Sequence, residues 1–126
     1  YDDVVRETID ELVARVDAAT DAGIAPSRIV IDPGIGFGKR GAQNWAVLHA
    51  LPQFAALGRR VLVGTSRKGF LAETIGQDPT IQRRDLATAV TSVLAAQAGA
   101  WAVRVHDVSA TCHALRVAAA WEDPWT

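Results

Sequence analysis

The sequence has one cysteine, no surplus of basic residues and no long apolar run. Cys112 alone cannot form an intramolecular disulfide and has no partners in a metal-ligand pattern, so we interpret it as a small helix residue. A net charge of −1 gives no reason to expect a nucleic-acid partner. No apolar run approaches the roughly 18 residues of a membrane span, and the acidic start YDDVVRETIDEL is unlike a secretion signal. We therefore expect a cytoplasmic protein that binds neither nucleic acid nor membrane.

What the sequence does contain is a regular alternation of helical and strand-like apolar spacing over 126 residues, of which 49% are hydrophobic. This balance is typical of one globular domain. Apolar steps of three and four residues predict helices, and continuous apolar triplets predict parallel strands that are covered on both faces. The predicted helices span a first segment ending at Gly23, residues 43–57 with a break at Pro52, residues 84–98, and residues 109–121 with Ser109 as N-cap; the predicted strands span residues 29–31, 61–63 and 102–105.

A helix followed by three strand–helix units predicts an α/β fold with a parallel sheet. Four helices can hardly cover both faces of three apolar strands, which indicates a part of a larger fold. A (β/α)₈ TIM barrel takes about 250 residues, so we interpret residues 1–126 as the C-terminal half of one barrel domain, with the N-terminal half absent from this chain. A small doubly wound sheet is the alternative. In both folds, ligands bind at the carboxyl ends of the strands.

The first strand runs directly into an aspartate and a glycine-rich loop, in RIVIDPGIGFGK. Because Pro33 and Gly34 follow Asp32, its carboxylate should be held on a rigid turn, where it can accept two N–H groups from a planar heterocycle. Alternatively, Asp32 caps the turn that follows it. The loop does not match the P-loop pattern, because Pro33 stands where that pattern has its first glycine. It does not match the Rossmann pattern G-x-G-x-x-G either, because its glycines occur at every second position.

The second strand ends in Gly64-Thr65-Ser66-Arg67-Lys68-Gly69, which we expect to lead into a short helix and to favour an anion. Ser66 could hold a carboxylate, and Lys68 could act as a fixed cation or hydrogen-bond donor beside a polar ring. The alternative is a basic turn that faces water.

The third strand carries Arg104 and His106, two residues apart, which predicts that both side chains project to the same face. This pair favours a phosphate, and barrels often bind phosphate after their last two strands. Asp107 should orient one of the pair or cap the last helix, and His49 and His113 receive no role.

The blocks DPGIGFGK, VLVGTSRKGFL and VRVHDV, in this order, resemble the C-terminal half of bacterial dihydropteroate synthases. The resemblance spans essentially the whole chain. It implies a transferase that joins p-aminobenzoate to hydroxymethyl-dihydropterin pyrophosphate, releasing pyrophosphate and forming dihydropteroate for folate biosynthesis. It also implies a homodimer and a Mg²⁺ cofactor whose ligand lies in the absent N-terminal half, with no metal ligand in this chain. By itself this chain should be inactive.

The resemblance also implies roles for the residues at the strand ends. Asp32 and Lys68 would bind the pterin, and Lys68, Arg104 and His106 would be the catalytic residues. Arg104 and His106 would hold the departing pyrophosphate.

The remaining substrate-binding positions implied by the resemblance lie in the first two loops. Phe37 would help to form the p-aminobenzoate pocket, Ser66 would receive the p-aminobenzoate carboxylate, and Arg67 would flank the pocket, with Gly64 also in contact with substrate.

Two alternatives to the synthase remain open. One is a non-catalytic pterin-binding paralogue, and the other is a half-barrel fragment that associates with a second copy to cover its sheet. A corrinoid-dependent methyltransferase fits less well, because its folate substrate has no pyrophosphate for Arg104 and His106 to bind.

Overall fold

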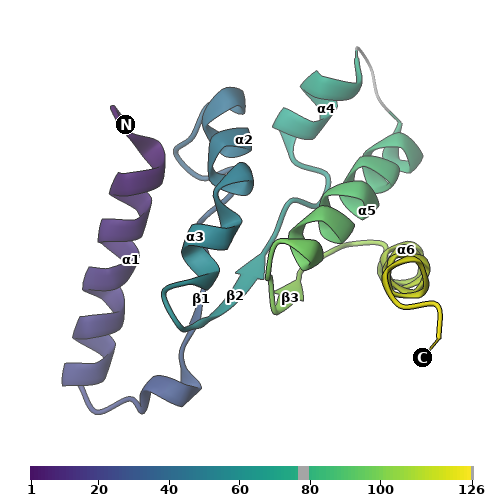
Figure 1. Cartoon of the computed structure of the whole chain (residues 1–126). Helices are drawn as coiled ribbons and strands as arrows, with labels where there is room; N and C mark the ends of the chain where they lie inside the picture. The colour runs from purple at the N-terminus through teal and green to yellow at the C-terminus, as the bar shows by residue number, and fades with distance from the viewer. Residues whose placement is uncertain (77–79, 126) are drawn as a thin grey trace.

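The computed structural model describes residues 1–76 and 80–125, and these form a leading helix followed by three strand–helix units (Figure 1). This is the predicted order. The described elements are α1 (Val4–Asp21), the short 3-10 helix η1 (Pro26–Arg28), β1 (Val30–Ile31), α2 (Gly41–His49), α3 (Leu51–Ala55), β2 (Arg60–Val63), α4 (Gly69–Ile75), α5 (Ile81–Gln97), β3 (Ala102–Val103) and α6 (Val108–Glu122).

The three strands form a parallel sheet in the order β1-β2-β3, which confirms the predicted sheet. Ile31 is paired with Val61, and Val63 with Val103, so the strands end close to the same level. The carboxyl ends of parallel strands share one edge, and the chain segments that follow all three strands therefore meet there.

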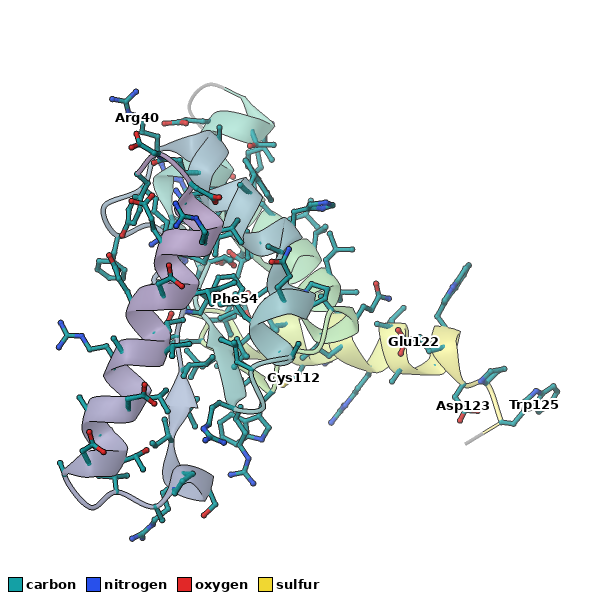
Figure 2. The ribbon with its side chains drawn as sticks, turned by 60° about the vertical axis from the view of Figure 1, so that its left-hand side comes forward. Arg40, Phe54, Cys112, Glu122, Asp123 and Trp125 are labelled. Atoms are coloured by element: carbon teal, nitrogen blue, oxygen red, sulfur yellow. The ribbon has the colours of Figure 1, made fainter. Side chains whose placement is uncertain are left out.

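One side of the sheet packs against helices. Phe54 of α3 lies in the middle of the body and is fully buried with Val47, Val61 and Val63 (Figure 2). Helix α1 packs against this core through apolar residues spaced three or four positions apart, which are Val5, Ile9, Leu12 and Val16. Burial of these apolar side chains stabilises the layer of helices against the strands.

Other parts of the structure are only partly covered, in line with the expectation that these helices cannot cover both faces of the apolar strands. The side chain of Val30 in β1 is 40% exposed, whereas its neighbour Ile31 is 3% exposed. Helix α6 extends away from the body, and Trp121 near its end is exposed (Figure 2). This open arrangement is what the interpretation of the chain as part of a barrel predicts, since strands of a complete barrel are covered on both faces.

The predicted break near Pro52 is confirmed: the segment 43–57 contains two helices, α2 and α3, which meet at Ala50, and Pro52 lies in the first turn of α3, where a missing N–H costs little. Two other predictions need correction. The strand predicted over 102–105 ends at Val103, so Arg104 and His106 lie beyond it and not on one strand face. The N-cap of α6 is Asp107 and not Ser109, since the Asp107 carboxylate accepts the N–H of Ala110 at 3.0 Å.

Candidate active site

The segments after β1, β2 and β3 come together at the carboxyl edge of the sheet. An Arg104 guanidinium nitrogen lies 3.4 Å from a carboxylate oxygen of Asp32, which joins the third segment to the first. The Ser66 hydroxyl lies 2.6 Å from Nδ1 of His106, which joins the second segment to the third. We call the edge formed by residues 32–40, 64–68 and 104–107 the rim. It brings together Asp32 and Arg104, which are 72 positions apart in the sequence.

The Asp32 carboxylate uses its two oxygens differently. One oxygen accepts the backbone N–H of Gly34 at 2.9 Å. Asp32 therefore caps the turn that follows it, as the alternative prediction stated. The other oxygen faces Arg104, in a contact where 37% of the Asp32 side chain and 57% of the Arg104 side chain are exposed. The first bond fixes the direction of the carboxylate. The second oxygen remains accessible to a ligand, while an exposed ion pair of this length stabilises the fold little.

Lys68 reaches across from the second segment and lies against the glycine-rich loop. Its ammonium group donates a hydrogen bond to the Ile35 carbonyl and lies 4.7 Å from the centroid of the Phe37 ring. A Cβ atom at Gly36 would lie 2.6 Å from Cδ of Lys68, so any side chain at this position would force the lysine to shift. The loop and the lysine therefore fit each other closely. The Phe37 ring is 67% exposed, so this ring and the cation are available to a planar ligand.

Burial and charge together lower the pKa of Lys68 below its ordinary value. Desolvation is the largest cause, the positive charge of Arg104 acts in the same direction, and Asp32 opposes both. A cation held this way interacts strongly with an acceptor placed beside it, because it has lost part of its hydration. This environment supports the prediction of a fixed cation at the rim and not that of a basic turn in water.

Gly64 lies where the Arg104 side chain crosses the end of β2. A Cβ atom added to Gly64 would lie 2.6 Å from a terminal guanidinium nitrogen of Arg104. The lack of a side chain at this position leaves room for the guanidinium beside the end of β2. In this structure, Gly64 therefore makes room for the Arg104 side chain.

Asn44 holds the glycine-rich loop in shape, and the sequence analysis did not identify it. Its side chain is 2% exposed, and its oxygen accepts the N–H of Gly36 at 2.7 Å. Its amide nitrogen donates to the carbonyls of Lys39 and Arg40 at 3.4 and 3.1 Å. The available signal was an amide placed three residues before the core residue Val47, on the inward face of the helix behind the loop.

Arg67 is bound to α5 and held in an unusual backbone conformation. Its φ of 57° is the only positive value among non-glycine residues in the described ranges. Its guanidinium makes two parallel hydrogen bonds, of 2.9 and 3.1 Å, to the carboxylate of Asp85, and its N–H donates to the Thr88 hydroxyl at 3.2 Å. The sequence analysis missed Asp85, although it is the single acidic residue within α5. Such bidentate pairing orients the guanidinium and stabilises the turn that precedes Lys68.

We expect Asp85→Asn to destabilise the protein at neutral pH. The hydrogen bonds from Arg67 are the main cause that lowers the pKa of the Asp85 carboxyl below its ordinary value of 3.8. A depressed carboxyl pKa stabilises the fold above the unfolded-state value and loses this effect as the pH falls through the folded-state value. The midpoint of thermal unfolding should therefore drop by roughly 2 °C at pH 7, and the difference should shrink to nothing at a pH well below 3.8.

The matched control is Asp17→Asn, at an exposed position of α1. This variant should unfold like the wild type at both pH values. A difference between Asp85→Asn and wild type that persisted unchanged in acid would contradict a charge-based role for the pair.

Ser66 and His106 form the most closely connected pair of the rim. Ser66 is 8% exposed, and its hydroxyl accepts the backbone N–H of His106 at 2.9 Å in addition to its contact with Nδ1. The short helix predicted after this segment is α4, which begins at Gly69 with Lys68 as its N-cap, so Ser66 lies in the turn before the helix. Asp107 caps α6 through its carboxylate, so of its two predicted roles the structure shows the cap.

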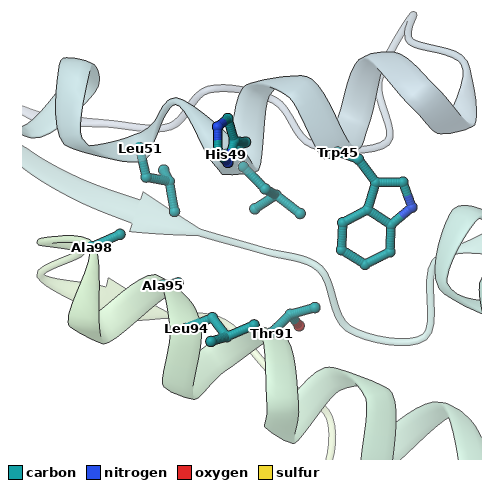
Figure 3. Close-up of a pocket in the computed structure, with 8 residues that line it drawn as sticks. Trp45, His49, Leu51, Thr91, Leu94, Ala95 and Ala98 are labelled. Carbon is teal, nitrogen blue, oxygen red and sulfur yellow. The ribbon is translucent and has the colours of Figure 1, made fainter.

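One polar pocket borders the rim and is lined by Gly38, Lys39 and Arg40, whereas the apolar pockets lie elsewhere. The pocket drawn in Figure 3 has a volume of about 340 Å³ and lies between α2, α3 and α5, with Trp45, Leu51 and Leu94 among its lining residues. His49 also lines it, whereas none of the rim residues does. Its walls are largely apolar, so it lacks the charged groups that the rim gathers.

Three further observations concern metals, the cysteine and membranes. Among residues 1–76 and 80–125, no group of three or more histidine, cysteine or acidic side chains is placed to hold a metal ion. Cys112 is free and exposed on α6. Within the same described residues, none of the helices combines the length and apolar character needed to cross a membrane.

The fold and the rim define the class of protein. A parallel α/β sheet whose strand ends gather a carboxylate, a lysine and an arginine–histidine pair is suited to a polar heterocycle and an anion. The chain belongs to the family of pterin binding enzymes, whose model matches residues 1–106.

Within this family the chain is similar to dihydropteroate synthases. It is 51% identical over 125 residues to the dihydropteroate synthase of Mycobacterium leprae, covering 96% of this chain and 44% of that protein. Its structure matches the dihydropteroate synthase of Xanthomonas albilineans in complex with 7,8-dihydropteroate, with a TM-score of 0.93 and 46% identity, covering 98% of this chain and 47% of that one. The same enzyme with 4-aminobenzoic acid matches equally well, at a TM-score of 0.93 and 46% identity, covering 98% and 45%.

The comparisons confirm the predicted resemblance and the predicted fold class. The synthase fold is a TIM barrel, and the described strands and helices form only part of one. The chain spans less than half of the length of each of these relatives.

Proposed function

We propose that this chain contributes the C-terminal portion of one pterin-binding barrel domain in a dihydropteroate synthase. The reaction joins p-aminobenzoate to hydroxymethyl-dihydropterin pyrophosphate and yields dihydropteroate and pyrophosphate. The observation that carries the proposal is the convergence of Asp32, Lys68, Arg104 and His106 at one rim, from three different strand ends. The ligands of the Xanthomonas albilineans relatives, 7,8-dihydropteroate and 4-aminobenzoic acid, support the choice of substrates.

The pterin would be held between the first and second segments. The accessible oxygen of Asp32 would accept N–H groups from the guanidine-like edge of the ring, while Lys68 would donate to its carbonyl side. Lys68 is already placed over the Phe37 ring, so a planar pterin would meet a cation and an aromatic face together. The carboxylate matches the donor side of the heterocycle, and the ammonium group matches its acceptor side.

The p-aminobenzoate would lie beside this site. The exposed Phe37 ring would cover its aromatic face, and Arg67, held by Asp85, would flank the pocket. Ser66 was predicted to receive the carboxylate, but its hydroxyl contacts His106. Gly64 contributes by leaving space for Arg104 beside the substrates.

Arg104 and His106 would hold the pyrophosphate. In the reaction, the bond between the pterin methylene carbon and the pyrophosphate oxygen breaks, and the electron pair leaves with pyrophosphate. The ring system stabilises the resulting cation until the amine nitrogen of p-aminobenzoate attacks it and loses a proton. Because negative charge grows on the leaving oxygen, a fixed guanidinium and an imidazole N–H stabilise the transition state more than the ground state.

We further propose that Mg²⁺ assists the pyrophosphate and that the protein acts as a homodimer in the cytoplasm. When bound, the metal would supply positive charge to the leaving group. We assign its ligand to the part of the relatives that this chain does not span. An exposed apolar stripe on α5, formed by Leu86, Val90 and Leu94, lines a second pocket and would suit a second copy of the chain.

The test is pyrophosphate release by the complete gene product, supplied with hydroxymethyl-dihydropterin pyrophosphate and Mg²⁺, with and without p-aminobenzoate. We expect release that depends on p-aminobenzoate and falls in Lys68→Ala. Pterin binding without any release would instead support a non-catalytic pterin-binding paralogue. A chain that binds no pterin and changes mass with concentration would support the self-associating half-barrel.

A further inference from the structure

The hydroxyl group of Ser66 contacts His106 twice. It accepts the backbone N–H of His106 at 2.9 Å and lies 2.6 Å from the ring nitrogen Nδ1. Ser66 is 8% exposed, so its hydroxyl hydrogen needs an acceptor within the protein. In the part of the chain that the structure describes, the acceptor within hydrogen-bond distance of this hydroxyl is Nδ1.

The number of hydrogens shared by the hydroxyl and the ring determines the tautomer of the His106 imidazole. A hydroxyl carries one hydrogen, and a neutral imidazole carries one N–H. If the hydroxyl of Ser66 donates to Nδ1, that nitrogen has no hydrogen, and the ring hydrogen of His106 is on Nε2. The opposite tautomer would donate from Nδ1 to Ser66 and would leave a buried hydroxyl hydrogen without an acceptor, which is unfavourable.

The geometry also leaves Nε2 free to meet a ligand. His106 is exposed at the rim, and residues 1–76 and 80–125 contain no hydrogen-bond partner of its Nε2. A neutral imidazole donates from only one nitrogen, so a mobile tautomer would present an acceptor to an anion part of the time. A fixed Nε2–H presents a donor at all times.

We propose that Ser66 is a positioning residue that holds His106 as the Nε2–H tautomer, so that its ring donates a hydrogen bond to an oxygen of a diphosphate at the rim. The identity of the anion as the pyrophosphate of the pterin substrate rests on the proposed function. The same hydroxyl hydrogen cannot also be donated to the carboxylate of p-aminobenzoate. This assigns Ser66 to the leaving-group site.

The first part of the test reads the tautomer directly. The complete gene product, labelled with ¹⁵N-histidine, is studied by long-range ¹H–¹⁵N NMR at about pH 9, where imidazoles are neutral. The His106 signals are those that disappear in His106→Gln. We expect the coupling pattern of an Nε2–H ring for His106 in the wild type, and a mixture of tautomers in Ser66→Ala. An Nδ1–H ring in the wild type would overturn the proposal, and this spectrum is informative even if Ser66→Ala does not fold.

The second part measures inorganic pyrophosphate binding by calorimetry. Ser66→Ala should bind pyrophosphate roughly five- to tenfold more weakly, the usual size of one hydrogen bond. Ser66→Thr, which keeps a hydroxyl, should restore both the tautomer and the affinity. Ser109→Ala, at an exposed serine of α6, should match the wild type. Affinity lost equally in the alanine and threonine variants would contradict the role of the hydroxyl.

The two proposals fail in different ways. If the complete gene product shows no transfer to p-aminobenzoate while His106 is an Nε2–H ring and pyrophosphate binding depends on Ser66, the proposed function fails and the role of Ser66 stands. If transfer occurs and His106 carries its hydrogen on Nδ1, the role of Ser66 fails and the function stands.

Discussion

Replacing Lys68 with alanine should weaken pterin binding, and replacing Arg104 with alanine should weaken pyrophosphate binding, each by about 1.5–3 kcal/mol for a lost charge-assisted bond. These values correspond to a loss of affinity between about tenfold and about a hundredfold. The separation is expected because Lys68 lies against the loop after β1, whereas Arg104 crosses the end of β2 and faces Asp32. Each ligand would lose a different partner.

The measurement is calorimetric titration of both variants of the complete gene product with a pterin and with inorganic pyrophosphate. Each variant serves as the control for the other, because Lys68→Ala should keep most of its pyrophosphate affinity and Arg104→Ala most of its pterin affinity. Unchanged affinity for both ligands in both variants would refute the site assignment. Equal losses for both ligands in both variants would point to a general disturbance of the rim.

Gly36→Ala should combine a loss of stability with a loss of pterin affinity. Gly36 has a φ of 85°, where a side chain costs about 1–2 kcal/mol. Its new methyl group would also lie 2.6 Å from Cδ of Lys68, so the lysine must leave its place over Phe37. We therefore expect a pterin affinity reduced about as much as in Lys68→Ala, with a lower midpoint of thermal unfolding.

Gly38→Ala is a closely matched control from the same loop. Gly38 has a φ of 62°, so the backbone strain should be similar, but nothing lies within 4 Å of a Cβ atom at this position. This variant should lose a similar amount of stability and keep the pterin affinity of the wild type. The same loss of affinity in both variants would show that loop strain, and not the contact with Lys68, controls pterin binding.

Much of this site could be predicted because it depends on a rule of topology. Parallel strands end at a common edge, so Asp32, Lys68 and Arg104 could be assigned to one rim from the order of the elements alone. The motifs around them were specific enough to identify a family, which the match over residues 1–106 confirms. The expected strand geometry of Arg104 and His106 was wrong because β3 ends two residues earlier than its apolar pattern indicates.

The supporting residues could not be predicted in the same way. Asn44 and Asp85 lie within helices, where an amide or a carboxylate usually faces water, and only the packing of α2 and α5 behind the loops makes them partners of Gly36 and Arg67. The contact between Ser66 and His106 joins residues 40 positions apart, and no local pattern in the sequence encodes it.

The sequence by itself determined the alternation of elements, the parallel sheet and the kinds of groups at the strand ends, because these follow from local apolar periodicity and from turn residues that neighbouring positions specify. Only the tertiary structure decided which of those groups touch: that Arg104 lies over Gly64 beside Asp32, and that the Ser66 hydroxyl contacts His106. The physical reason is that hydrogen bonds and charge interactions act over a few ångströms in space, whereas the residues that make them are dozens of positions apart along the chain.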